Sequence, residues 1–239
     1  MSAPAAHDLR FAVPLYTVAE AARALDVPAT TFATWVKGYV RHPVGRSEVR
    51  GAPVVTALPA APGEASVPFV GLAEGLVLAA IRRAGVPLQR VRPALAVLQR
   101  ELGVEHALAS RRLYTDGAEV LFDYGVSSAV DAGFVAQLVV VRNGQRVFAA
   151  VVASYLQRVD YDPADGFAAL IRLPAYAGEV VCDPRRSFGR PIFLRGGARV
   201  DDVLARFQTG ESLDELSGEF GVPLADLEDA LRAASRRAA

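Results

Sequence analysis

The sequence lacks the features expected of secreted, membrane-spanning or uniformly basic proteins. Its single cysteine, Cys182, cannot form an internal disulfide. The 26 basic side chains are balanced by 26 acidic ones, so any contact with phosphates must come from a local basic patch. The apolar runs are too short to cross a bilayer, and residues 1–10 have neither the basic nor the apolar region of a secretory signal. We therefore expect a cytoplasmic protein with no membrane partner.

Residue patterns that carry catalysis or hold metals are also missing from the sequence. The three histidines share no metal-ligand spacing: His7, His42 and His106. The sequence contains no phosphate loop of the Walker type, no dinucleotide fingerprint and no nucleophile elbow. Three aspartates surround residue 163, and an Asp-Pro turn explains Asp160, Asp162 and Asp165 without a cation. We expect a protein that acts by binding, with no catalytic residue, no metal and no cofactor.

What the sequence does contain is a repeated helix-turn-helix pattern. Its 239 residues allow one large domain or two modest ones. Residues 17–32 are similar to residues 212–227, and a looser copy pairs a helix over 72–83 with another over 88–102. The first two copies open with a capping box, in which a hydroxyl and a carboxylate satisfy amides of the first helical turn: Thr17 with Glu20, and Ser212 with Glu215. Each copy therefore predicts a helix, a tight turn and a second helix.

The N-terminal copy is followed by a local patch of basic residues. Because the net charge of the chain is zero, contact with phosphates would need such a patch. Trp35 stands at helical spacing from Phe32 and is expected to anchor the second helix in a core. A segment rich in glycine and proline then predicts a wing. If the helix enters a major groove while the wing holds phosphates, the candidate DNA-binding residues are Thr30, Thr31, Thr34, Lys37, Arg41, Arg46 and Arg50.

The middle of the chain predicts strands as well as helices. Asp116-Gly117 and Asn143-Gly144 each interrupt an alternating run, which predicts β-hairpins over residues 111–122 and 138–148. Apolar residues at helical spacing predict a helix from about residue 149 to about 160, and a strand is predicted over 167–173. The fold class expected is α+β, with a winged helix-turn-helix head over residues 10–122 and a mixed domain over 123–239 that ends in the second helix-turn-helix unit.

Two parts of the sequence resemble known families. Residues 16–22, Tyr-Thr-Val-Ala-Glu-Ala-Ala, followed by 31–36, Thr-Phe-Ala-Thr-Trp-Val, are similar to the MerR-type helix-turn-helix, and residues 69–98 are similar to the helical pair that follows it. From Asp183-Pro184 to Ala230-Leu231, the chain resembles a small domain of unknown function found in antitoxins paired with PIN-domain ribonucleases. Taken together, nearly the whole chain resembles the VapB-type antitoxins of VapBC toxin–antitoxin pairs.

The resemblance implies an antitoxin that neutralises a PIN-domain ribonuclease and binds operator DNA to repress its own operon, as a homodimer or a higher hetero-oligomer. An arginine placed among the metal-binding carboxylates of such a nuclease would compete with metal or RNA phosphate. The candidate toxin-binding residues are Arg185, Arg186, Arg190, Arg195 and Arg199. The alternative for these side chains is a solvated loop or an internal pair with Asp183.

Two other functions fit the same residues. The first is a stand-alone MerR-like transcription regulator whose middle domain binds a small molecule. The second is an adaptor that makes no DNA contact and uses its helical pairs for protein–protein interaction. A gene for a small, acidic-site nuclease beside this one would favour the antitoxin over both.

Overall fold

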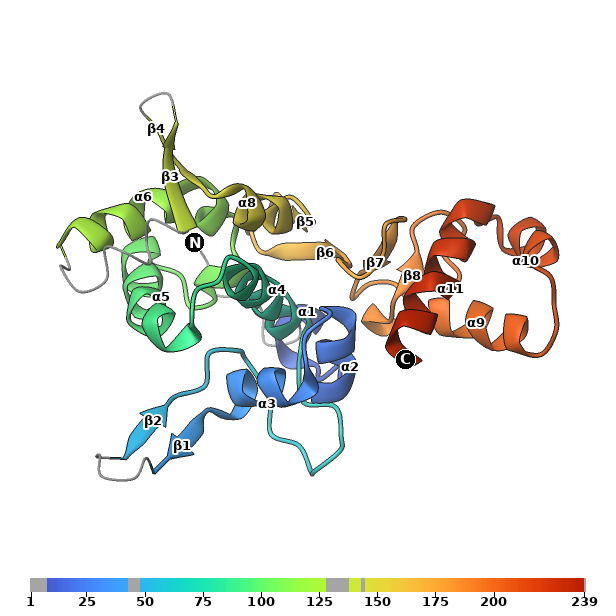
Figure 1. The fold of residues 1–239 in the computed structure, drawn as a ribbon, viewed down its shortest axis with the longest axis horizontal. Helices are drawn as coiled ribbons and strands as arrows, with labels where there is room; N and C mark the ends of the chain where they lie inside the picture. Colours follow the sequence, from blue (N-terminus) through green and yellow to red (C-terminus); the bar gives the residue numbers. More distant parts are fainter. Residues whose placement is uncertain (1–7, 43–47, 128–137, 143–144, 239) are drawn as a thin grey trace.

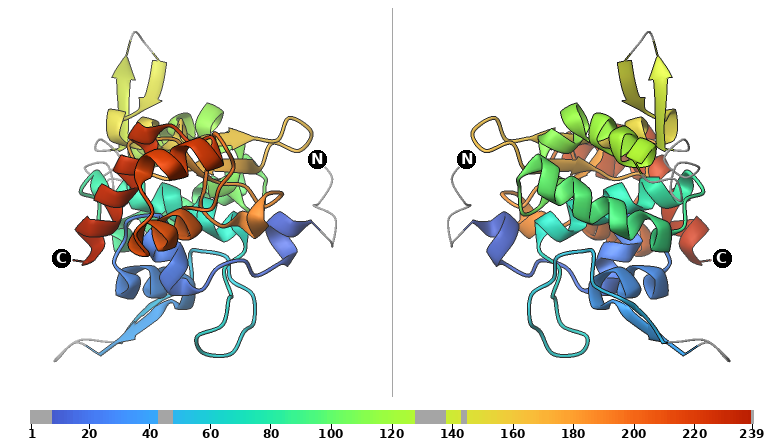
Figure 2. Two further views of the ribbon diagram at one scale, coloured as in Figure 1. Left: turned by 90° about the vertical axis from the view of Figure 1, so that its right-hand side faces the viewer. Right: turned by 90° about the vertical axis from the view of Figure 1, so that its left-hand side faces the viewer.

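The fold is of the α+β class, as the sequence predicts. A computed structural model describes residues 8–42, 48–127, 138–142 and 145–238. Figure 1 shows an elongated molecule in which a large N-terminal part is joined through a small sheet to a C-terminal group of helices. Two hairpins project from opposite sides of the N-terminal part (Figure 2): β1 (Tyr39–Arg41) with β2 (Val49–Gly51), and β3 (Val139–Arg142) with β4 (Gln145–Phe148). Within the described part of the chain, no helix combines the length and apolar character needed to cross a membrane.

The predicted helix-turn-helix and wing are both present at the N-terminal end. The elements are α1 (Leu9–Ala12), α2 (Val18–Ala24), α3 (Ala29–Lys37), β1 (Tyr39–Arg41) and β2 (Val49–Gly51). The two strands pair antiparallel, with Val40 opposite Arg50. The basic segment after α3 is thus a β-hairpin wing, as its composition predicts.

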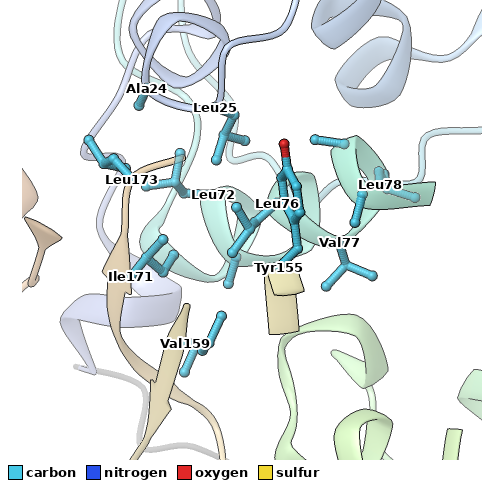
Figure 3. Close-up of a cluster of buried hydrophobic side chains, with 14 of the residues drawn as sticks. Ala24, Leu25, Leu72, Leu76, Val77, Leu78, Tyr155, Val159, Ile171 and Leu173 are labelled. Atoms are coloured by element: carbon cyan, nitrogen blue, oxygen red, sulfur yellow. The ribbon is translucent and has the colours of Figure 1, made fainter. Parts of the chain in front are cut away.

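Helix α4 (Phe69–Arg83) is the centre of the hydrophobic core. All of its residues from Phe69 to Ile81 are buried, because a helix that is apolar on every side must be covered on every side. Figure 3 shows Leu72 and Leu76 of this helix among side chains of α2, α8 (Ala150–Leu156), β5 (Val159–Tyr161) and β6 (Ala168–Arg172). The elements packed around α4 hold the helix-turn-helix and the sheet in one continuous core.

The predicted hairpin over residues 111–122 is wrong. Helix α5 (Leu88–Leu102) and the short η1 (Ala107–Ala109) lead into α6 (Arg111–Ser127), which is helical through Asp116 and Gly117. The buried residues Leu113, Ala118 and Leu121 recur at helical spacing, and this periodicity outweighs the Asp-Gly turn signal. Helix α6 also passes through residue 122, while the division into domains of 10–122 and 123–239 stays a prediction.

The structure confirms the two antiparallel strands of the second predicted hairpin. β3 (Val139–Arg142) pairs antiparallel with β4 (Gln145–Phe148), and the predicted turn residues Asn143 and Gly144 lie outside the described residues. Helix α8 (Ala150–Leu156) starts where the apolar spacing predicts, but it ends before the predicted residue 160 because Val159–Tyr161 form a strand. Its buried residues pack on α4, which closes this side of the core.

A four-stranded antiparallel sheet joins the core to the C-terminal helices. Its order along the sheet follows the chain: β5 (Val159–Tyr161), β6 (Ala168–Arg172), β7 (Val180–Cys182) and β8 (Ile192–Phe193). The turn η2 (Ser187–Gly189) lies between β7 and β8. The predicted strand over 167–173 is therefore confirmed. Residues 185–199, which contain the five candidate toxin-binding arginines and are called the arginine-rich segment below, follow β7 and include β8.

The C-terminal helices repeat the N-terminal pattern. They are α9 (Val200–Gln208), α10 (Leu213–Phe220) and α11 (Leu224–Ala238). Ser212 and Glu215 form the predicted capping box at the start of α10, and Gly221 ends that helix with a left-handed φ of 63°. Leu216, Val222 and Leu227 are buried residues of α10, the turn and α11, and they belong to the same continuous core.

Candidate nucleic-acid interface

The first helix of the N-terminal unit is fixed by its capping box. The backbone amide of Glu20 donates to the Thr17 hydroxyl at 3.1 Å, and the amide of Thr17 donates to the Glu20 carboxylate at 2.8 Å. Its inward face consists of alanines, Ala21, Ala22 and Ala24, which let α3 approach closely. The local sequence thus sets both the start of α2 and its distance from α3.

Helix α3 is anchored by two aromatic side chains. Trp35 is 2% exposed and its ring centroid lies 5.8 Å from that of Phe32. Phe32 also packs against α4 at Gly75, where a Cβ would lie 2.6 Å from the Phe32 ring. Trp35 is therefore the core anchor that the sequence predicts, and the opposite face of α3 is directed outward.

The outward face of α3 is a stripe of short side chains that ends in a cation. Thr30, Ala33, Thr34 and Lys37 stand at i, i+3, i+4 and i+7, so they share one face of the helix. Thr30 and Lys37 are exposed, while Thr34 is half-buried and donates its hydroxyl to the Thr31 carbonyl at 2.7 Å. Because three of its four side chains are short, the stripe leaves the backbone of α3 close to the molecular surface.

Two grooves border this stripe. One is lined by Thr30, Thr31 and Thr34 together with Arg82 at the end of α4. The other lies between α3 and residues 57–66, the loop that follows the wing. Arg82 is a basic residue beside α3 that the sequence interpretation missed, because nothing in the spacing of α4 shows that its last turn faces α3.

The wing is attached to the body at its base. Gly38 has a φ of 72°, and a Cβ there would collide with the Gly51 carbonyl. The Arg92 guanidinium of α5 lies 5.3 Å from the ring centroid of Tyr39, and it also donates to the Ala52 carbonyl. These contacts orient the strands while their tips extend away from the core (Figure 1).

The structure describes the three predicted arginines of the wing to different extents. Arg50 is exposed on β2 and pairs with Glu48, which also lies 3.4 Å from His42. The backbone of Arg41 belongs to β1, and Arg46 lies outside the described residues. Glu48 therefore partly neutralises Arg50, whereas Lys37 on α3 and Arg82 in the bordering groove have no such described acidic partner.

The arginine-rich segment is largely paired inside the molecule. Three of its five arginines contact acidic residues: Arg185 with Asp162 at 2.6 Å, Arg190 with Glu20 at 2.7 Å and Arg199 with Asp202 at 3.7 Å. The expected alternative partner, Asp183, instead accepts from the backbone amide of Arg185 at 2.9 Å. Among the described residues, Arg186 and Arg195 have no ion-pair partner.

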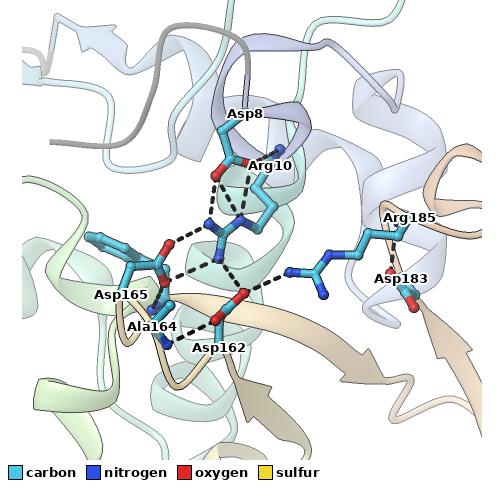
Figure 4. Close-up of polar contacts among 8 residues, drawn as sticks. Asp8, Arg10, Asp162, Ala164, Asp165, Asp183 and Arg185 are labelled. Atoms are coloured by element: carbon cyan, nitrogen blue, oxygen red, sulfur yellow. Dashed lines mark hydrogen bonds and ion pairs between the residues drawn. The ribbon is translucent and has the colours of Figure 1, made fainter. Parts of the chain in front are cut away.

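The turn between β5 and β6 is held by the arginines around it (Figure 4). Arg10 is buried between Asp8 and Asp165, and Asp162 receives the guanidinium of Arg185. The backbone amide of Ala164 and the Arg185 guanidinium lower the pKa of Asp162. These aspartates are thus occupied by arginines, which gives the turn a structural role.

The arginine-rich segment also contacts the helix-turn-helix directly. The Tyr16 hydroxyl donates to the Gly189 carbonyl at 2.7 Å, and Arg190 pairs with Glu20 of the α2 capping box. Burial raises the pKa of Tyr16 well above its ordinary value and that of the Cys182 thiol to about 12. Both groups stay protonated at neutral pH, so this junction is fixed by neutral hydrogen bonds and one ion pair.

The fold at the N-terminal end is that of a winged helix-turn-helix protein. Residues 14–95 match a family model described as "Putative DNA-binding HTH domain", and residues 180–233 match one described as "Protein of unknown function (DUF433)". These two segments contain the winged head and the arginine-rich segment with its C-terminal helices.

Relatives along the full length make the identification specific. Over 231 residues the chain is 48% identical to "Putative antitoxin VapB45" of Mycobacterium tuberculosis, covering 95% of this chain and 96% of the relative. It is 27% identical to Rv2308 of the same organism, covering 91% and 88% of the two chains. The crystal structure of Rv2018 from M. tuberculosis superposes with a TM-score of 0.82 at 44% identity, covering 93% of this chain and 99% of that one. The chain belongs to the VapB-type family of antitoxins.

Proposed function

We propose that this antitoxin binds operator DNA with its head and restrains a PIN-domain ribonuclease with its arginine-rich segment, repressing its own operon as a homodimer or a higher hetero-oligomer. The observation that carries the DNA contact is the α3 stripe of Thr30, Ala33, Thr34 and Lys37, which stands beside the projecting wing. In this arrangement α3 lies in the major groove and β1–β2 contacts the adjacent sugar-phosphate chain.

The charges near α3 set the kind of DNA binding to expect. Lys37, Arg82 and the wing arginines supply only a few phosphate contacts, so a single head binds weakly and its affinity depends on salt. A homodimer that places two heads one helical turn apart, about 34 Å, would bind a two-fold symmetric operator much more tightly. The small side chains of the stripe favour close approach to thymine methyl groups over long-range contacts to guanine.

The charges of the arginine-rich segment support the nuclease partner. Three arginines of the segment form ion pairs with Asp162, Glu20 and Asp202. Arg186 and Arg195 have no ion-pair partner among the described residues and can therefore contact a partner protein. A guanidinium among the clustered carboxylates of a PIN nuclease would displace divalent metal or the RNA phosphate. We therefore assign the inhibitory contact to Arg186 or Arg195, and a positioning role to the three paired arginines.

A salt titration tests the DNA contact. The affinity for a fluorescent duplex from upstream of the gene is measured by anisotropy at salt concentrations between about 50 and 300 mM. The slope of log affinity against log salt concentration reports the number of phosphate contacts. Lys37→Ala is expected to weaken binding to all sequences alike and to lower the salt slope by about one. Arg232→Ala, which removes an exposed arginine of α11, is the matched control and should change neither. An unchanged slope for Lys37→Ala would contradict the proposed placement of α3.

A growth assay tests the second half of the proposal. The antitoxin is co-expressed with the product of the adjacent gene, which the proposal expects to be the nuclease, and wild type is expected to restore growth and to co-purify with it. The double variant Arg186→Ala/Arg195→Ala is expected to lose the rescue while it keeps DNA binding. Full rescue by this double variant would show that neither arginine reaches the nuclease site.

A further inference from the structure

The turn η2 exposes an aromatic side chain that the winged head and the paired arginines do not explain. Phe188 is 80% exposed, more than any other large apolar side chain in the described part of the chain. An apolar ring gains nothing from water at this position. Its exposure is costly to solubility, which makes it a candidate contact residue.

The backbone at this turn is strained in order to present the ring. Ser187 and Phe188 have φ values of 47° and 51°, and Gly189 continues the left-handed run at 73°. Glycine adopts this region freely, whereas a bulky residue does so rarely. Since a side chain that is 80% exposed gains little from packing to offset this strain, the hydrogen bonds around the turn must impose its conformation. Such enforced strain is typical of functional positions.

The surroundings do impose it. The amide of Gly189 donates to the Arg186 carbonyl and the amide of Arg190 donates to the Ser187 carbonyl, each at 3.0 Å. The buried Tyr16 hydroxyl fixes the Gly189 carbonyl from the side of the head. Phe188 is thus presented on a rigid turn, and a partner that binds it need not order the loop first.

The charge around Phe188 indicates what kind of surface it meets. Residues 183–199 contain five arginines and one acidic residue, Asp183. Arg186, two positions from Phe188, has no ion-pair partner among the described residues, and its guanidinium lies next to Gly197 in the turn that carries Arg195. An aromatic ring flanked by unpaired cations is complementary to an apolar pocket bordered by carboxylates.

We propose that Phe188 is the aromatic anchor by which this antitoxin docks onto its toxin nuclease, inserting into an apolar pocket on the nuclease surface that is bordered by acidic side chains. This inference rests on the proposed function and adds to it the residue that supplies docking affinity. The arginines then supply inhibition and orientation, whereas the buried ring supplies most of the binding energy, as aromatic hot spots do in other interfaces.

The test compares three variants against the purified nuclease encoded beside the gene, by titration calorimetry. Phe188→Gly removes the ring and suits the left-handed backbone, so its melting temperature is expected to equal or exceed that of wild type. Its dissociation constant is expected to rise about 30-fold or more. Phe188→Tyr keeps an aromatic ring and is expected to bind within about threefold of wild type. Phe207→Ala, which truncates a 37% exposed phenylalanine of α9, is the control and should bind normally.

The outcomes separate this inference from the function it rests on. If wild type binds the nuclease and Phe188→Gly binds equally well, the anchor is wrong while the antitoxin function stands. If wild type does not bind the nuclease at all, the proposed function fails first. A loss of DNA binding or a change in the mass of the free antitoxin in Phe188→Gly, with nuclease binding intact, would assign the ring to DNA or to a second copy and would overturn the inference.

Discussion

Replacing Trp35 with alanine should unfold the DNA-binding head. Trp35 is 2% exposed and packs against Phe32 at a centroid distance of 5.8 Å. Its backbone carbonyl also receives the amides of Val54 and Val55, so α3 and the segment after the wing meet at this residue. The substitution removes the largest side chain in this part of the core.

The magnitude follows from the buried area and the cavity left behind. An aromatic side chain of this kind buries about 150–250 Å², which at about 25 cal/mol per Å² corresponds to roughly 4–6 kcal/mol as an upper estimate. Measured substitutions of buried tryptophan or phenylalanine by alanine cost about 3–5 kcal/mol. We expect a loss of about 4 kcal/mol, a large share of the roughly 5–15 kcal/mol that stabilises a typical domain.

Guanidinium unfolding followed by far-ultraviolet circular dichroism measures this loss. Fluorescence serves only the wild type, because Trp35 is the single tryptophan of the chain. Lys37→Ala, on the exposed face of the same helix, is the matched control and should shift the free energy of unfolding by less than about 0.5 kcal/mol. If Trp35→Ala unfolds at the wild-type midpoint and still binds DNA, Trp35 does not anchor α3 and the reasoning is refuted.

Three further predictions concern other parts of the fold. Burial opposes the charged form of His106, but the hydrogen bond and charge of Glu74 outweigh it and raise the pKa of His106. Its contribution to stability is therefore full below about pH 6.5 and is lost as the pH rises through the higher folded-state value. Urea midpoints between pH 5.5 and 9 should show this fall in wild type and not in His106→Gln, and parallel curves would contradict it. Gly38 has a φ of 72° and a ψ of −168°, a conformation essentially restricted to glycine, and a Cβ there would collide with the Gly51 carbonyl oxygen. Gly38→Ala should therefore cost about 1–3 kcal/mol. DNA affinity should drop with helical content unchanged, and wild-type affinity would show that the wing base tolerates the change. The buried Asp229 accepts the amides of Ala177 and Gly178 at 2.7 and 3.0 Å, so Asp229→Ala should lower the free energy of unfolding by about 1–3 kcal/mol, a loss that an unshifted denaturation curve would exclude.

The elements that the sequence predicts correctly depend on local signals. The capping boxes at Thr17 and Ser212 need only residues three positions apart, and both form as expected. Apolar spacing likewise identifies α4, α5 and α8, because amphipathic or fully apolar periodicity is set within one helix. Such features could be predicted since no distant segment decides them.

The failed hairpin shows where local signals mislead. Asp116-Gly117 is typical of a type I′ turn, yet Gly117 lies inside α6. A Cβ at Gly117 would lie 2.8 Å from Leu113 and 3.2 Å from the Phe148 ring of β4. The glycine is therefore needed for close approach of the hairpin β3–β4 to α6, and only the tertiary structure reveals that need.

The sequence predicts which residues belong to the candidate sites better than it predicts the partners and the exposure of those residues. Thr30, Thr34 and Lys37 on the outward face of α3 could be predicted from their helical spacing around Trp35. The partners of Arg185 and Arg190 could not be predicted in this way. Asp162 and Glu20 are distant in sequence, and the sheet and α2 bring them close to these arginines. The exposure of Phe188 depends on its left-handed backbone, for which the sequence at 187–188 carries no signal.

Cross-linking to DNA tests the placement of the head most directly. A duplex from upstream of the gene, substituted with 5-bromouracil, is irradiated in complex with the full-length antitoxin, and mass spectrometry locates the cross-linked residues. Cross-links should fall within α3 (Ala29–Lys37) and the wing strands β1 and β2. Cross-links confined to residues 180–233, with none in α3 or the wing, would contradict the binding of DNA by the N-terminal helix-turn-helix.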